Sequence, residues 1–480
     1  MDHIQHGVYQ NPLNTRYASQ DMKYIFSDHK KFSTWRRLWV ELARAEQVLG
    51  LNITSAQIDE MESHIESINF ETAKNYEKQF RHDVMAHIHA FGKQCPTARP
   101  IIHLGATSAF VGDNTDLIQM RDALDVVRRG LVNVIRNLRS FALEYRALPT
   151  LGFTHFQPAQ LTTVGKRACL WLQELVIDYH DLLHVRSTIR FRGVKGTTGT
   201  QASFLDLFNG DHDKVKKLDR MVSEALGFTD AFRITGQTYT RKMDSRIASV
   251  LSGISQTFSK MSNDIRLLAH LKEIEEPFEK SQVGSSAMPY KRNPMRSERM
   301  SSLARFVISL DSSLAATAST QWFERTLDDS ANKRLSIPQM FLGVDALLQI
   351  AVNVTSGLVV YPSVIRKRID EELPFIASEN IMMEAVKQGG DRQELHEEIR
   401  RLAQEAGRRV KEEGASNELL DMICNSERFN LNEAKIAKLM EPSRYIGRAP
   451  EQVDEFISAE VDTILETEKD SADIDVDLHV

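Results

Sequence analysis

Residues 114–149 read NTDLIQMRDALDVVRRGLVNVIRNLRSFALEYRALP, and this stretch decides the fold class. Its apolar side chains recur in steps of three and four, which is the spacing of a stripe along one face of a helix. The stripe consists of Leu117, Met120, Leu124, Val127, Leu131, Val134, Leu138, Phe141, Tyr145 and Leu148. At about 1.5 Å per residue such a helix is roughly 50 Å long, and Pro149 should end it. A helix of this length needs other long helices to cover its apolar face.

Four further stretches carry the same periodicity: Leu161 to Ile189, Met243 to Leu268, Leu303 to Leu314 and Met340 to Val354. The 480 residues include only 13 prolines and 23 glycines, and alternating β-branched runs are scarce, which favours helices over sheets. We therefore predict an all-α protein with one elongated five-helix bundle from residue 108 to residue 360. The chain should leave the bundle at Tyr361-Pro362.

The segments on either side of the bundle have a different character. Residues 1–107 predict shorter helices; Gly50 closes one of them, and Thr54 with Gln57 forms a capping-box signature for the next. Residues 361–480 are rich in charge and predict short amphipathic helices followed by a polar, acidic tail, expected to be mobile, to which we assign no function. We expect three regions packed together, at 1–107, 108–360 and 361–480. The surplus of apolar stripes predicts an obligate oligomer.

Composition excludes several classes of protein. A chain of 480 residues with 42% hydrophobic content can bury a large core without disulfides or metals. Cys95, Cys169 and Cys424 have no paired spacing, so they predict neither a disulfide framework nor a zinc site. No signal-peptide pattern and no uninterrupted apolar run long enough to cross a bilayer is evident. We interpret the protein as cytoplasmic.

The formal charge of −6 comes from 60 basic and 66 acidic residues spread along the whole chain. No global field therefore attracts nucleic acid or an anionic membrane, and neither is predicted as a partner. An anionic ligand has to be bound by locally placed arginines.

The segment GSSAMPYKRNP at residues 284–294 fits neither a helix nor a strand, because a glycine, two prolines and paired serines lie together between two long helices. Such a segment is a candidate functional loop. It resembles the signature loop of the fumarase/aspartase superfamily, whose members eliminate fumarate from succinyl compounds.

Four more motifs narrow the resemblance to the adenylosuccinate lyase family, of the animal type. They are RHDVMAH at 81–87, HLGATS at 103–108, TLGFTHFQPAQLTT at 150–163 and QWFERTLDDSANKR at 321–334. The resemblance implies three helical domains whose central bundle assembles into a tetrameric core. It also implies release of fumarate from adenylosuccinate and from succinylaminoimidazole carboxamide ribotide, with no cofactor and no metal.

Elimination of fumarate needs a base for a carbon-bound proton, an acid for the leaving nitrogen, and a cation beside the carbanion. By resemblance Ser285 is the base and His155 is the acid, while Lys291 and Asn293 have the properties that stabilise the carbanion. His82 should orient the substrate or bind its phosphate. Taken alone, Ser285 reads more simply as a serine that makes a turn hydrogen bond, and His155 as a histidine bonded at a helix start.

The resemblance also implies the groups that bind the substrate. The residues that should bind the succinyl carboxylates are Thr107, Ser108, Thr154 and Gln237. The run Arg81, His82, Asp83 contains the ingredients of a positioned imidazole close to the substrate. The residues that should bind the phosphate and ribose are Arg16, Tyr17, Arg299, Arg325, Ser330 and Arg334. Each arginine alone reads more simply as a surface ion-pair partner. In the family, each active site draws segments from three subunits.

Two other patterns predict no cofactor. His82, His87 and His89 do not place two ligands one helical turn apart, so no metal site is expected. Gly193, Gly196 and Gly199 match no nucleotide-binding loop and predict a flexible connection, with a lid as the alternative.

Three other functions compete with this interpretation. Argininosuccinate lyase shares the loop and the chemistry, but its substrate has no phosphate; Arg325, Ser330 and Arg334 argue against it, as does the Tyr290-Lys291-Arg292 form of the loop. A structural or storage protein that keeps the fold without activity has no need for the intact set of His82, His155, Ser285 and Lys291. A helical scaffold for protein partners leaves the loop at 284–294 unexplained.

Overall fold

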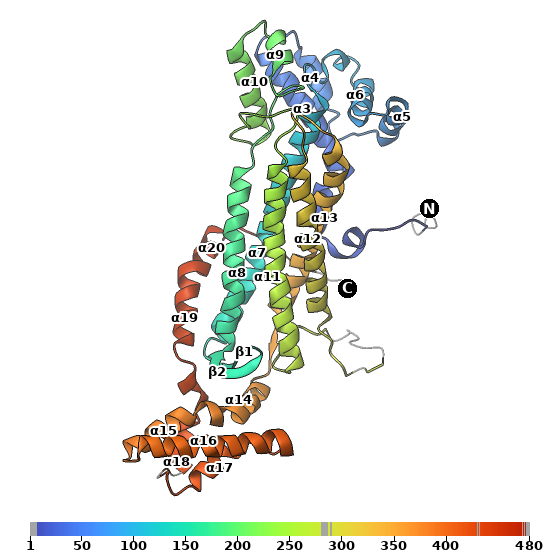
Figure 1. Ribbon diagram of the computed structural model, residues 1–480. Helices are drawn as coiled ribbons and strands as arrows, with labels where there is room; N and C mark the ends of the chain where they lie inside the picture. Colours follow the sequence, from blue (N-terminus) through green and yellow to red (C-terminus); the bar gives the residue numbers. More distant parts are fainter. Residues whose placement is uncertain are drawn as a thin grey trace.

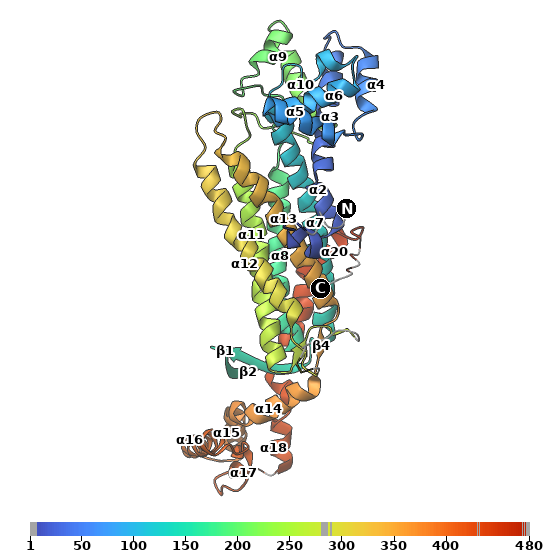
Figure 2. The same cartoon turned by 90° about the vertical axis from the view of Figure 1, so that its right-hand side faces the viewer.

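The computed structural model describes residues 7–279, 287–288, 290–429, 431, 433–472, 474 and 476. Long helices run side by side through the middle of an elongated molecule, and shorter helices gather at its two ends, as Figures 1 and 2 show. The five long helices are α7 (Ser108–Glu144), α8 (Val164–Thr188), α11 (Lys242–His270), α12 (Met295–Ser319) and α13 (Asp328–Ser356). The all-α fold and its five long helices are confirmed.

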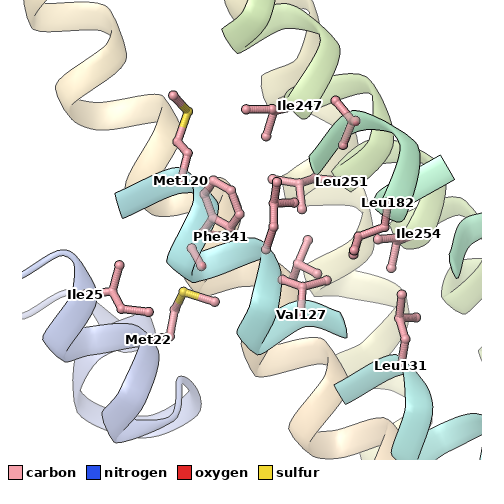
Figure 3. Close-up of a cluster of buried hydrophobic side chains, with 14 of the residues drawn as sticks. Met22, Ile25, Met120, Val127, Leu131, Leu182, Ile247, Leu251, Ile254 and Phe341 are labelled. Carbon is pink, nitrogen blue, oxygen red and sulfur yellow. The ribbon is translucent and has the colours of Figure 1, made fainter. Parts of the chain in front are cut away.

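The apolar stripe of α7 forms the centre of the bundle. From Leu117 to Phe141 every stripe residue is at most 7% exposed. Figure 3 shows side chains of α7, α8, α11, α13 and α2 (Gln20–Ile25) meeting in one core; the labelled residues are Met22, Ile25, Met120, Val127, Leu131, Leu182, Ile247, Leu251, Ile254 and Phe341. Burial of these long stripes against one another holds the bundle together.

Helix α7 ends at Glu144, before the predicted stop at Pro149, with Tyr145 as its C-cap, and the start of α8 packs against this end. The backbone N–H of Gly165 donates to the carbonyl of Tyr145 at 3.0 Å. A Cβ at Gly165 would lie 2.3 Å from the carbonyl oxygen of Ala142. Glycine is therefore required where the two helices approach.

Helix α13 is long and apolar enough to cross a membrane, with a mean hydropathy of 1.5 over its most apolar 18-residue window. The apolar stripe from Met340 to Val354, predicted from the sequence as part of the bundle, lies within this helix. In the structure 78% of that window is buried in the protein. Core packing therefore accounts for its apolar character.

The N-terminal residues form one end of the molecule. The elements at this end are α3 (Asp28–Val48), α4 (Ser55–Glu62), α5 (Phe70–Phe80), α6 (Asp83–Gln94) and η2 (Arg99–Ile101), together with α9 (Ala202–Leu207) and α10 (His212–Ala225), as Figure 1 shows. Before them, η1 (Leu13–Tyr17) and α2 pack along the bundle against α13 and α7. The predicted capping box is confirmed, because Thr54 and Gln57 each bond the backbone of the other. Gly50 follows α3 with φ +98°, which ends that helix.

The C-terminal residues form the opposite end and have a core of their own, built from residues between Ala377 and Leu439. Their elements are β4 (Val359–Val360), α14 (Pro362–Ile376), α15 (Ser378–Lys387), α16 (Arg392–Arg408), η3 (Arg409–Glu413), α17 (Leu419–Cys424), α18 (Glu433–Leu439), η4 (Pro442–Tyr445), α19 (Ala449–Phe456), η5 (Ile457–Val461) and α20 (Asp462–Thr467). Helices α19 and α20 return along the bundle beside α8 and α7 (Figure 1). Asn133 bonds the backbone of Ala472 and Ile474, so part of the acidic tail lies against α7.

One expectation about secondary structure was wrong. The stripe beginning at Leu161 predicted a helix there, but α8 starts at Val164, and an antiparallel hairpin precedes it, formed by β1 (Pro149–Thr154) and β2 (Gln157–Thr163). Threonine and proline are frequent in this stretch and disfavour a helix interior. Leu161 and Thr163 are buried because alternate residues of a strand face the same side. Leu161 therefore lies three residues before Val164, in step with the apolar stripe of α8, and looked like part of that stripe. A second, separate antiparallel pair joins β3 (Ile274–Glu275) to β4.

Candidate active site

A cleft of about 420 Å³ opens at the N-terminal end of the bundle. Its walls come from the junction of α5 and α6, the first turns of α7, the segment before α11 and the first turns of α13. Eight of the residues predicted from the sequence line it: Arg81, His82, Asp83, Ser108, Gln237, Arg325, Ser330 and Arg334. The fold thus brings together four segments that are far apart along the chain.

The run Arg81, His82, Asp83 lies where α5 ends and α6 begins. Arg81 has φ 54°, a left-handed conformation that ends α5 and turns the chain at once into α6. His82 caps α6, because its Nδ1 accepts a hydrogen bond from the backbone N–H of Met85 at 3.3 Å. This bond fixes the ring of His82 at the wall of the cleft.

Asp83 is the third residue of that run. Its carboxylate accepts hydrogen bonds from the backbone N–H of Val84 at 2.8 Å and from Arg334 at 2.9 Å. Burial acts to raise the pKa of Asp83, but the Val84 N–H and the charges of Arg334 and Lys31 hold it below the usual value. Asp83 is therefore an anion that holds Arg334 in the cleft.

The first turn of α7 forms a second wall. Thr107 is the cap residue, yet its side chain makes no capping hydrogen bond. The first backbone N–H groups of this 37-residue helix are therefore not bonded by the Thr107 side chain. Together with the helix dipole, they favour an anion at the N-terminus of α7. The side-chain amide of Gln237 donates to Thr107 Oγ1 at 3.5 Å, so the fold unites three of the four residues assigned to the carboxylates.

The start of α13 contributes the basic wall. Arg325 donates from Nη1 to both carboxylate oxygens of Asp329, at 2.9 and 3.0 Å. Ser330 and Arg334 follow on the first two turns of the helix and line the same cleft. Two arginines and a hydroxyl with this placement can bind a phosphate.

Several residues of the cleft were missed by the sequence analysis: Lys31, Asp113, Asp116, Arg241, Asp329 and Lys333. Lys333 Nζ lies 2.8 Å from Asp116 and is nearly buried, while Lys31 lies over the rings of Phe32 and Trp35. Burial acts to raise the pKa of Asp113, but Arg241 and Lys333 hold it below the usual value. No local pattern in the sequence marks these six residues, because the burial of each charge depends on partners far away along the chain.

The predicted acid lies elsewhere in the chain. His155 and Phe156 form the two-residue turn between β1 and β2, with φ 52° and 57°. Two consecutive positive φ values are typical of a type I′ turn, and holding non-glycine residues there costs free energy that functional sites often retain. His155 and Thr154 are exposed at the tip of this hairpin, at the end of the bundle opposite the cleft (Figure 2).

The described end of the signature loop, residues 290–294, also lies away from the cleft, because it leads into α12. Ser285 falls outside the described residues. Lys291 is exposed, and Asn293 and Arg299 are partly buried at the start of α12. Glu276 caps that helix by accepting from the backbone N–H groups of Arg296 at 3.0 Å and Ser297 at 2.9 Å.

Arg16 and Tyr17 occupy a third position, on η1, which packs against α13. The three histidines weighed as metal ligands have separate environments. His87 stacks on Phe32, His89 contacts Tyr76 and Phe80, and His82 caps α6. Within the described part of the chain, no group of histidine, cysteine and carboxylate side chains could hold a metal ion.

The glycines at 193, 196 and 199 belong to the connection from α8 to α9. Arg192, which is fully buried, donates to the carbonyls of Gly193 and Gly196, and Asn114 bonds both backbone groups of Gly193. The backbone N–H of Val194 donates to Asp219 at 2.7 Å. These bonds hold the segment beside the cleft in one conformation, whereas the sequence predicted a flexible connection.

Two family models match the chain. The one described as Lyase matches residues 40–309, and the one described as Adenylosuccinate lyase C-terminus matches residues 374–456. Adenylosuccinate lyase of Saccharomyces cerevisiae is 55% identical over 95% of this chain and 96% of its own length. The Schistosoma mansoni enzyme is 47% identical over 96% and 97%, and the Pyrococcus horikoshii enzyme is 31% identical over 93% and 97%. The eukaryotic sequences are thus the more similar ones.

Solved structures share the fold. A 3-carboxy-cis,cis-muconate lactonizing enzyme from Pseudomonas putida superposes with a TM-score of 0.81 at 23% identity, covering 95% of this chain and all of that one. A fumarate lyase from Mesorhizobium sp. BNC1 superposes with a TM-score of 0.78 at 22% identity, covering 94% of this chain and all of that one. At these identities the likeness concerns the fold alone.

Proposed function

This chain belongs to the adenylosuccinate lyase family, and from that membership we infer that it splits adenylosuccinate into AMP and fumarate. One observation carries the assignment of the site. Eight residues named from the family resemblance line a single cleft, although they come from four separate segments of the chain. The reaction needs no cofactor, because the substrate's own carboxylate stabilises the carbanion.

We propose that the cleft binds the substrate at two sets of donors. One succinyl carboxylate lies at the first turn of α7, where Thr107, Ser108 and Gln237 supply hydroxyl and amide donors beside the helix N-terminus. The phosphate lies at the start of α13, where Arg325 and Arg334 supply paired N–H groups. Donor sets at the two places suit a ligand with an anionic group at each end.

A second substrate fits the same donors. Succinylaminoimidazole carboxamide ribotide has the same succinyl-nitrogen unit and the same ribose 5-phosphate as adenylosuccinate. We expect both to be cleaved, because only the ring between the two anionic ends differs. Removal of the phosphate should weaken binding severely, since each charge-assisted hydrogen bond contributes about 1.5–3 kcal/mol.

The chemistry is a β-elimination. Ser285, as the base, takes the proton from the carbon next to the one that carries nitrogen; the electron pair forms the double bond of fumarate, and the C–N bond breaks. His155 gives its proton to the departing nitrogen. The ammonium of Lys291 and the amide of Asn293 stabilise the carbanion between these two events. His82, fixed by its bond to Met85, orients the substrate in the cleft.

The groups that perform this chemistry come from more than one chain. The cleft lies at the start of α7, while the His155 hairpin and the start of α12, which follows the signature loop, lie toward the far end of the bundle. A second and a third copy must therefore bring those segments to the cleft. We propose a homotetramer around the central bundle, divided into helical domains at 1–107, 108–360 and 361–480.

We further propose a cytoplasmic location. It is supported by the cysteines, all three of which are described and none of which forms a disulfide. The same reducing environment suits an enzyme of nucleotide metabolism.

The alternative functions fare worse against the observations. Argininosuccinate lyase activity leaves the Arg325, Ser330 and Arg334 cluster without a phosphate to bind. A structural role does not require charged side chains in an open cleft, and a scaffold role gives no reason for the strained turn at His155.

A direct assay tests the proposal. Purified protein is incubated with adenylosuccinate, and AMP and fumarate are measured; both should appear in equal amounts. Absence of turnover by the folded oligomer contradicts the proposed function. Equal efficiency with the dephosphorylated nucleoside contradicts the assignment of the arginine cluster.

A further inference from the structure

We propose that Asp329 is a positioning residue that orients the guanidinium of Arg325 toward the phosphate of the substrate. The inference rests on the proposed function, because it takes Arg325 as a phosphate contact. The Asp329 side chain is fully buried, and its two oxygens both accept from Nη1 of Arg325. Arg325 itself is 27% exposed at the cleft, so the pair joins the interior to the ligand site.

The orientation of the pair leaves donors available. Every hydrogen bond that Arg325 makes to a described residue comes from Nη1. Its Nε and Nη2 groups form the other edge of the guanidinium, which suits two parallel hydrogen bonds to a phosphate. One edge of the guanidinium is thus held by the protein, and the other remains for the ligand.

Asp329 is held in turn from below. Arg241 Nε donates to Asp329 Oδ2 at 2.6 Å, and the Nη groups of Arg241 donate to Asp113 at 3.0 and 3.2 Å. The guanidinium of Arg241 lies 4.5 Å from the ring centre of Tyr239, whose backbone N–H donates to Asp113 at 2.9 Å. The chain of contacts runs from Arg325 through Asp329 and Arg241 to Asp113 on α7.

Stability alone does not explain this arrangement. Arg241 is 2% exposed, Asp113 is 8% exposed and Asp329 is 0% exposed, so three charged side chains at the cleft wall are almost entirely shielded from solvent. Burying such pairs carries a desolvation penalty that apolar residues of similar size would avoid. Arg325 is the most exposed member of this arrangement, at 27%, and its guanidinium is the one that the buried charges leave accessible to a ligand.

A second cleft arginine is held in the same manner. Arg334 donates from Nη2 to Asp83 Oδ2, while Asp83 Oδ1 accepts from the backbone N–H of Val84. Each basic residue of the proposed phosphate site therefore has a carboxylate on one edge. The difference is depth, because Asp83 is 27% exposed and Asp329 is fully buried.

The test compares Asp329→Asn with Asp328→Asn. Asp328 is the neighbouring, exposed carboxylate, which bonds Thr320 and Gln321 and does not line the cleft. The kcat and KM values are measured for adenylosuccinate and for its dephosphorylated nucleoside. Asp329→Asn should raise KM for adenylosuccinate by about tenfold or more, with kcat and the nucleoside's kcat/KM little changed. Asp328→Asn should behave as wild type.

The outcomes separate the inference from the proposed function. If Asp329→Asn lowers the efficiency with both substrates equally, Asp329 is structural and the inference is overturned. If wild type cleaves both substrates equally well, the phosphate site itself is wrong. A partly unfolded preparation still decides the matter, because neither KM nor the ratio of the two kcat/KM values depends on the fraction of active enzyme.

Discussion

Ser108 and His155 lie at opposite ends of α7 within one chain. Ser108 begins this 37-residue helix at the cleft, and the hairpin that carries His155 follows its end. At about 1.5 Å per residue the two side chains are separated by roughly 55 Å. No side-chain movement closes such a gap, so an active site that uses both must take them from different chains.

The packing of α8 on α7 predicts the effect of Gly165→Ala. The added methyl group would meet the backbone of Ala142 and Arg146, which cannot move without displacing α7, so we expect destabilisation of about 1–3 kcal/mol or more. Gly407→Ala is the matched control, because Gly407 is also helical but has no atom within 4 Å of the new Cβ. Gly407→Ala should stabilise by about 0.5–1 kcal/mol.

The measurement is denaturant unfolding at one fixed protein concentration. Equal effects of the two substitutions would show that the contact between α7 and α8 is looser than described.

The buried imidazole of His87 predicts acid sensitivity. Burial, and then the charge of Arg36, lowers its pKa from 6.5 to about 4, although Asp83 acts in the opposite direction. Between these two pH values the unfolded chain binds a proton that the folded chain excludes. The contribution of neutral His87 to the free energy of unfolding is therefore full above pH 6.5 and is lost as the pH falls toward 4. Each tenfold change in proton affinity is worth about 1.4 kcal/mol.

His87→Phe keeps a ring to stack on Phe32 but removes the titrating group. The free energy of unfolding of this variant should fall less between pH 7 and pH 5 than that of wild type. Parallel pH profiles for the two proteins would rule out His87 as a source of acid sensitivity.

The division of roles between Ser285 and His155 predicts different isotope exchange. Ser285→Ala should lose exchange of the carbon-bound proton with solvent, while His155→Ala should retain it if that step is reversible. Each substitution should lower turnover by about 10²–10⁴-fold and leave the oligomer folded. Deuterium incorporation into recovered substrate is the measurement, and the opposite pattern would reverse the two roles.

The fold was largely predictable from the sequence, because each long helix carries its own apolar stripe and needs no distant partner to be recognised. The hairpin was not, since Leu161 lies in step with the stripe of α8 although it belongs to β2. Pro149 and Pro158 disfavour a helix in this stretch, because each restricts its own backbone and that of the residue before it.

The site was predictable only through the resemblance of its motifs. Lys31, Asp329 and Lys333 have no local signal, because the burial of a charged side chain is decided by partners that lie far away in the sequence. Lys333, for example, lies 2.8 Å from Asp116, which is more than two hundred residues earlier in the chain. Composition could exclude a global basic field but could not locate such pairs.

The central claim is that each active site combines the cleft of one chain with the hairpin of another. Its most direct test mixes two inactive proteins, His155→Ala and the double variant Arg325→Ala with Arg334→Ala, under conditions that exchange subunits. Equal mixing should restore about a quarter of the wild-type activity, because that fraction of sites receives an intact cleft and an intact hairpin. No recovery after demonstrated exchange would contradict the account.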